Sequence, residues 1–187
     1  MTMKKTALAL AFAGASLAST GAMAQVYVLG GVGSGNIDVD CAGAAQCDKS
    51  DTAYKFVGGY SFGNGFSAEL GYTNYGKAKA SDSGIRAELE ANALQIGAAY
   101  QAPLATDWGL NLRLGLARMK TEISGSIAGV GSGSDSDTTT QPYFGIGVNY
   151  AFSKQVKVEL GADFSKAEFD GDKGNVRAVT VGLRYDF

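Results

Sequence analysis

The stretch that decides the fold is VTVGLRYDF, residues 179–187, because its side chains alternate strictly between two kinds. Successive side chains of a β-strand point to opposite faces. One face of this stretch would carry apolar and aromatic side chains only, those of Val179, Val181, Leu183, Tyr185 and Phe187. The other face would carry Thr180, Gly182, Arg184 and Asp186. The pattern predicts a strand with one apolar face and one polar face.

The same period of two recurs along the chain and indicates an all-β protein. Alternating segments lie at residues 54–62, 66–73, 94–100, 110–117, 143–152 and 156–164, and an apolar segment lies at 25–33. Residues 25–33 are apolar on both faces, so the sequence does not assign their register. An even number of segments of about ten residues, each with this period, is typical of bacterial outer-membrane barrels. The sequence therefore predicts an eight-stranded antiparallel up-and-down transmembrane β-barrel.

The connections between these segments alternate in length. Short connections are expected at 63–65, 103–107 and 153–155, and long ones at 34–51, 76–87, 122–140 and 169–175. In such barrels the short turns are periplasmic and the long loops face outward. We therefore expect four extracellular loops and two periplasmic termini. The segment SIAGVGSGSDSDTTT, residues 126–140, is small, polar and repetitive, and we expect it to be a mobile loop.

Alternation alone does not decide which face is buried. A soluble lipocalin-like carrier also has eight strands, with its apolar face inside. Here the aromatic residues gather beside the short connections and in the last segment, which is typical of an interfacial girdle facing lipid. These residues are Tyr60, Phe62, Phe66, Tyr100, Trp108, Tyr150, Phe152, Tyr185 and Phe187. We therefore expect the apolar faces to point outward, with the lipocalin-like carrier as the alternative.

The opposite faces carry charges of both signs among small residues. An eight-stranded barrel has an interior just wide enough for side chains, and charges buried there must be paired. We predict that an interior charge network forms from Lys55, Glu69, Arg113, Lys157, Glu159, Asp163 and Arg184. Within it, Glu69, Arg113, Lys157 and Arg184 share one inward face and are expected to stabilise the closed barrel.

The first 24 residues have the organisation of a secretory signal peptide. Lys4 and Lys5 precede an apolar run, and the A-x-A pattern at 22–24 predicts cleavage between Ala24 and Gln25. The expected domains are thus a cleaved signal peptide, 1–24, and a barrel, 25–187. Cleavage lowers the formal net charge from −2 to −4, which argues against nucleic acid as a partner.

The two cysteines lie close together in the first long connection. In an oxidising compartment, Cys41 and Cys47 are expected to form a disulfide that closes a small loop. A metal site would need further ligands, and the spacing is not the C-x-x-C of redox proteins. We expect no metal and no cofactor.

Several phrases resemble a known family. YKFVGGYSF (54–62), FSAELGYTNYGKA (66–78), ALQIGAAY (93–100) and TVGLRYDF (180–187) are similar to the small outer-membrane β-barrel family typified by the transmembrane domain of outer membrane protein A, with outer membrane protein X nearby. The resemblance implies residence in a Gram-negative outer membrane, contact with its lipid and lipopolysaccharide, and a monomer. It also implies that Thr180, Gly182, Tyr185 and Phe187 form a signal for the barrel-assembly machinery.

The sequence supports one leading function and one alternative. The leading hypothesis is a structural or surface-interaction barrel, and the alternative is a narrow channel for ions or small solutes. The barrel-shaped enzymes that modify lipid A resemble one another in a site built on His, and this chain contains no His. We therefore do not expect an enzyme.

Overall fold

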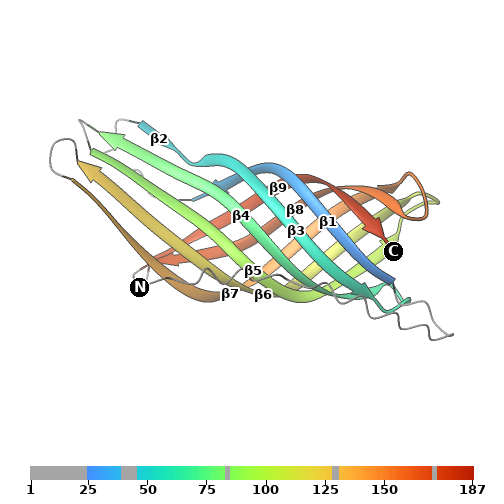
Figure 1. Cartoon of the computed structure of the whole chain (residues 1–187). Helices are drawn as coiled ribbons and strands as arrows, with labels where there is room; N and C mark the ends of the chain where they lie inside the picture. The colour runs from blue at the N-terminus through green and yellow to red at the C-terminus, as the bar shows by residue number, and fades with distance from the viewer. Residues whose placement is uncertain (1–24, 39–45, 83–84, 128–130, 170–171) are drawn as a thin grey trace, which may run out of the picture.

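A computed structural model describes residues 25–38, 46–82, 85–127, 131–169 and 172–187. Its elements are β1 (Gln25–Ile37), β2 (Gln46–Asp48), β3 (Ser50–Ser61), β4 (Phe66–Asp82), β5 (Ile85–Pro103), β6 (Trp108–Ile127), β7 (Gly131–Ala151), β8 (Val156–Phe169) and β9 (Asp172–Asp186). Figure 1 shows these strands running side by side at a steep tilt. No helix within the described ranges is long and apolar enough to cross a membrane.

The strands close into a barrel, as the alternation predicted. β1 pairs antiparallel with β3 on one side and with β9 on the other. The remaining neighbours pair in chain order, and β4 and β5 join the ends of the sheet. β2 is a short addition that pairs only with the far end of β4. Eight strands therefore form the wall, and closure pairs the backbone groups that lipid could not satisfy.

The strands are longer than expected, which corrects the predicted connections. β5, β6 and β7 contain 19, 20 and 21 residues. Most of 76–87, 122–140 and 169–175 is strand, including part of the segment expected to be a mobile loop. The β6–β7 ladder runs unbroken to Ile127 and Gly131. Beyond the apolar band both faces are polar, so the alternation disappears from the sequence although the backbone ladder continues.

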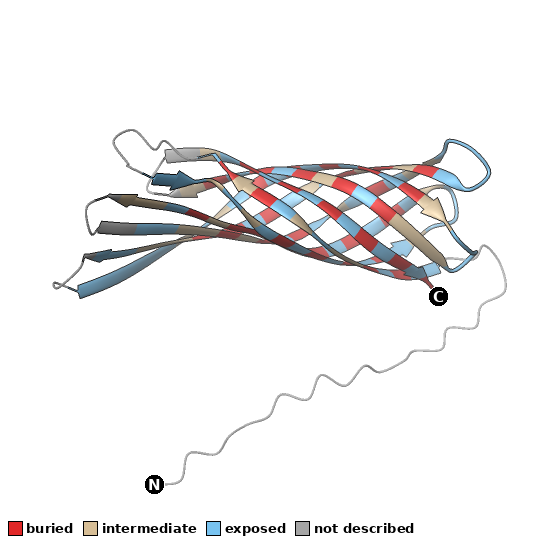
Figure 2. Ribbon diagram, turned by 90° about the horizontal axis from the view of Figure 1, so that it is seen from above, coloured by how far each residue is buried: buried red, intermediate tan, exposed pale blue. Residues whose placement is uncertain are grey.

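The barrel is closed more tightly at one end than at the other. The short turns all lie at the end where β9 finishes, and the long hairpins spread apart at the opposite end (Figures 1 and 2). β7 pairs with β8 only from Phe144 to Ala151. Pro142, just beyond, has no N–H to donate, and its carbonyl accepts a hydrogen bond from the Ser165 hydroxyl at 3.0 Å instead. We name the end with the short turns the turn end, and the other the hairpin end.

The outward face of the wall is apolar, which excludes the lipocalin-like alternative. Large apolar side chains remain exposed on all eight wall strands, among them Phe56, Leu70, Ile96, Leu114, Leu160 and Val181. The register of β1, unassigned from sequence, places Tyr27 and Leu29 inside and Val26, Val28 and Val32 outside. The alternating bands of buried and exposed residues are visible along each strand in Figure 2.

The interior is filled in two layers. An apolar cluster toward the hairpin end includes Ile37, Tyr75, Met119, Tyr143 and Val176. Charged and amide side chains fill the remainder. Glycines make room for the largest rings, since a Cβ on Gly59 would overlap the Tyr27 ring and one on Gly115 would lie 2.7 Å from the Tyr143 ring.

Candidate functional site

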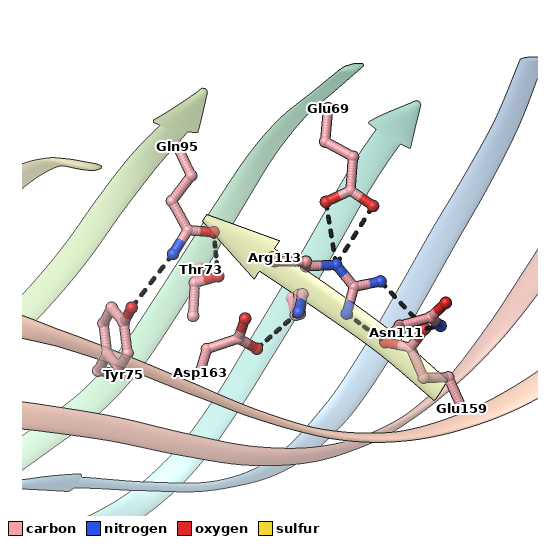
Figure 3. A network of polar contacts seen from close by, with 9 residues as sticks. Glu69, Thr73, Tyr75, Gln95, Asn111, Arg113, Glu159 and Asp163 are labelled. Atoms are coloured by element: carbon pink, nitrogen blue, oxygen red, sulfur yellow. Dashed lines mark hydrogen bonds and ion pairs between the residues drawn. The ribbon is translucent and has the colours of Figure 1, made fainter. Parts of the chain in front are cut away.

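The centre of the interior is an ion-pair cluster built around Arg113 of β6. Its Nε lies 2.9 Å from Glu69 Oε2 on β4. Its Nη1 lies 2.7 Å from Glu159 Oε1 on β8, and its Nη2 donates to Glu159 Oε2 at 3.0 Å (Figure 3). Asn111, two residues earlier on β6, also donates to Glu159. One guanidinium thus joins carboxylates from two other parts of the wall, all three side chains being almost fully buried.

A second ion pair crosses the barrel beside this cluster. Lys55 Nζ on β3 lies 2.6 Å from Asp163 Oδ2 on β8, and both side chains are at most 2% exposed. The other carboxylate oxygen, Asp163 Oδ1, is buried without a hydrogen-bond partner among the described residues. This pair bridges strands that are not neighbours in the sheet, so it holds opposite parts of the wall together.

Neutral polar side chains extend the network toward the hairpin end. The Thr73 hydroxyl donates to Gln95 Oε1 at 3.0 Å, and Gln95 Nε2 donates to the Tyr75 hydroxyl at 3.2 Å (Figure 3). These residues are not part of the predicted network, which contains charged side chains only. Their inward position was nevertheless readable from the alternation of β4 and β5.

Lys157 and Arg184 form a separate group near the turn end, so the structure does not place them directly on Glu69 and Arg113. Both contact Asp186, with Lys157 Nζ 3.1 Å from Oδ2 and Arg184 Nη2 2.6 Å from Oδ1. Asp186 lies on the inward face of VTVGLRYDF and joins the interior charges although it is not part of the predicted network.

Tyr27 links the two groups. The Arg184 guanidinium carbon lies 3.5 Å from the centre of the Tyr27 ring, a cation–π geometry. The Tyr27 hydroxyl donates to Glu69, which is paired with Arg113. The sequence missed Tyr27 because both faces of residues 25–33 are apolar.

The described interior charges balance. Four bases face four acids: Lys55, Arg113, Lys157 and Arg184 against Glu69, Glu159, Asp163 and Asp186. Pairing of this kind offsets the large cost of removing each charge from water. No group of three or more His, Cys, Asp or Glu side chains in the described ranges is placed to hold a metal ion.

A cavity of about 490 Å³ opens at the turn end. Its lining includes Gln25, Asn149, Lys157, Arg184 and Asp186. It is a polar vestibule that reaches the Asp186 group, beyond which the Arg113 cluster fills the interior.

Thr180 lies inward, and Tyr185 and Phe187 lie outward with ring centres 4.9 Å apart in an edge-on arrangement. Gln25 is the first residue of β1. Ala24 and Cys41 lie outside the described residues, so cleavage after Ala24 and the Cys41–Cys47 disulfide stay predictions.

Solved structures similar in shape include small outer-membrane barrels. Neisserial surface protein A superposes with a TM-score of 0.61 at 15% identity, over 87% of this chain and 97% of that one. The Yersinia pestis attachment invasion locus protein Ail, in complex with the heparin analogue sucrose octasulfate, gives 0.59 at 15% identity, over 87% and 99%. At this identity the similarity establishes the fold alone.

Sequence comparison identifies the family. Outer membrane protein A of Serratia marcescens is 28% identical over 99% of this chain and 56% of its own length, and that of Klebsiella aerogenes is 27% identical over the same shares. The chain spans about half the length of these curated relatives. Residues 6–187 match the family described as the outer membrane protein beta-barrel domain. The chain therefore belongs to the outer membrane protein beta-barrel family.

Proposed function

We propose that this barrel is a structural and surface-interaction protein of the bacterial outer membrane, with the hairpin end outside the cell and the turn end in the periplasm. The observation that carries the proposal is the contrast between the two ends. The hairpins extend far beyond the apolar band as polar strands, whereas the turns at the other end are short. Long extracellular and short periplasmic connections are the rule in such barrels.

In this role the hairpin end is a presentation surface with four extracellular loops. The outer parts of β6 and β7 carry exposed hydroxyl and acidic side chains, including Ser132, Ser134 and Asp135. The wall below contacts membrane lipid, including lipopolysaccharide, through its apolar band. The proposed role is non-enzymatic, with the eight paired interior charges holding the wall together.

The orientation is tested by labelling single cysteines in intact cells. Ser132→Cys at the hairpin end and Thr106→Cys in a short turn are a matched pair, since both residues are exposed. We expect a membrane-impermeant maleimide to label position 132 in intact cells and position 106 only after lysis. The unsubstituted chain controls for labelling of the native cysteines, and labelling at 106 alone in intact cells would overturn the orientation.

A narrow channel is the second candidate, favoured by the polar vestibule at the turn end. The Arg113 cluster opposes it, because fully buried side chains occupy the interior beyond the vestibule. Planar-bilayer recordings of the pure protein separate the two functions. Stable unitary currents would favour the channel, and a silent bilayer containing folded protein would favour the structural role.

A further inference from the structure

Positive charge is unevenly distributed around the outer surface of the wall, at the edge of the apolar band nearer the hairpin end. Each of the eight strands can be described by its first outward polar side chain beyond the apolar band, counted toward the hairpin end. On β1, β3, β4 and β5 these are neutral, namely Ser34, Thr52, Asn74 and Asn92. On β6, β8 and β9 they are Arg118, Lys166 and Arg177. On the intervening β7 it is Thr140, which lies beyond the apolar Pro142. We name Arg118, Lys166 and Arg177 the basic rim.

The pairing of the strands brings the basic rim onto one face. Arg177 lies opposite Phe164, and Lys166 lies opposite Asn175, so Lys166 and Arg177 are diagonal neighbours. Side chains in that relation are within about 7–8 Å of each other. Arg118 lies opposite Thr140 of β7, the strand between β6 and β8. β7 pairs with β8 only from Phe144 onward, so Arg118 lies apart from the Lys166–Arg177 pair, on the far side of β7.

The basic rim is available to a ligand. All three side chains are exposed, and none has an ion-pair partner in the part of the chain that the structure describes. Two other outward bases at the hairpin end are engaged, since Lys77 contacts Glu88 and Glu90, and Lys120 contacts Glu122. The nearest acid along β8, Glu168, accepts a hydrogen bond from Gln141 Nε2 at 2.7 Å.

An aromatic surface lies directly below the basic rim. Phe144 and Phe164 are outward and stacked, with ring centres 6.4 Å apart and planes at 23°. Phe164 is the cross-strand partner of Arg177. Bases immediately above apolar rings suit an amphiphile whose acyl chains lie on the rings and whose anionic headgroup meets the bases. Arginine and lysine both bind phosphate, arginine in bidentate geometry.

We propose that the β6–β9 face is a binding surface for a membrane lipid carrying more than one phosphate, of the diphosphorylated glycolipid class. Bases on three strands, with Arg118 set apart from the Lys166–Arg177 pair, exceed the reach of a single phosphate and suit a headgroup with phosphates at two positions. The inference rests on the proposed orientation, because it requires the basic rim to lie in the outer leaflet.

The test measures lipid binding to the full folded chain in a non-ionic detergent by native mass spectrometry. The probes are diphosphorylated lipid A, the same lipid without its phosphates, and phosphatidylglycerol. The test variant is Lys166→Gln with Arg177→Gln. The matched control is Lys79→Gln with Lys154→Gln, which removes two other exposed bases that have no ion pair among the described residues.

We expect the unsubstituted chain to bind diphosphorylated lipid A best. Affinity should fall roughly tenfold or more in the test variant and change less than about twofold in the control. Equal loss in both variants, equal binding of the phosphate-free lipid, equal binding of phosphatidylglycerol, or no binding would overturn the proposal. Boiling-dependent gel migration of each variant verifies folding. The labelling of positions 106 and 132 tests the orientation independently, so the two proposals fail separately.

Discussion

Arg113 is the residue on which the interior depends most directly. Its guanidinium contacts Glu69 and Glu159, and Asn111 and Tyr27 hydrogen-bond to the same carboxylates. Arg113→Ala would leave two buried carboxylates without their cation. Removal of one member of a buried ion pair costs about 3–5 kcal/mol. We expect the unfolding temperature in detergent to fall markedly.

Arg118→Ala is the matched control for this prediction. Arg118 is on the same strand but faces outward and has no ion pair among the described residues. Its replacement should change the free energy of unfolding by less than about 1 kcal/mol. Similar melting of the two variants would show that the interior pairs contribute no net stability.

Gly59 lies directly opposite Tyr27, and its replacement tests whether glycine is required where the Tyr27 ring packs against the inner wall. A Cβ at this position would overlap the ring of Tyr27, whose hydroxyl donates to Glu69. Overpacking of this kind costs about 1–3 kcal/mol, so Gly59→Ala should destabilise the barrel in urea titrations. Its neighbour Gly58 faces lipid, and a methyl group added there would have no other side chain or backbone atom within 4 Å. Gly58→Ala should therefore be close to neutral, and the reverse order of stabilities would contradict the packing.

The last strand, β9, is predicted to be recognised during assembly, a role that the folded structure does not display. By resemblance, Thr180, Gly182, Tyr185 and Phe187 form a signal that the assembly machinery reads. Phe187 has a close match in Phe152, since the two are 66% and 67% exposed. Each ring also contacts a tyrosine edge-on, at 4.9 Å from Tyr185 and 5.0 Å from Tyr150.

We predict that Phe187→Ala and Phe152→Ala differ in assembly but not in stability. Loss of either ring contact should cost about 0.5–1.5 kcal/mol in the purified, folded protein. Phe187→Ala should in addition lower the amount of folded barrel in the membrane fraction, measured by gel migration without boiling. Equal amounts of folded barrel for the two variants would contradict the assembly signal and indicate that Phe187 is only an interfacial aromatic residue.

The lengths of β6 and β7 show where sequence reasoning stops. Leu110 to Leu116 alternate because every second side chain faces lipid, so the membrane-spanning part was predictable. Residues 131–140 pair fully with β6 although they are small and polar. Water surrounds both faces there, so no alternation is required, and a long hairpin has the same composition as a loop.

The interior network was predictable to a similar degree. Charged residues on the inward faces could be identified from alternation, and balance of charge could be expected. Their partners could not, because pairing across the barrel depends on the stagger between strands. Lys55 meets Asp163, 108 positions later, and Tyr27 connects the two groups from a strand of unassigned register.

The molecule as a whole is a membrane-spanning barrel that is closed by the pairing of β1 with β9. Such a barrel should keep its structure in dodecyl sulfate at room temperature and unfold on boiling, because every wall strand has two neighbours. The most direct measurement is gel migration of the outer-membrane fraction with and without boiling. We predict that the unboiled chain migrates at a position distinct from that of the boiled chain. Identical migration of both samples, or absence of the chain from that fraction, would contradict this architecture.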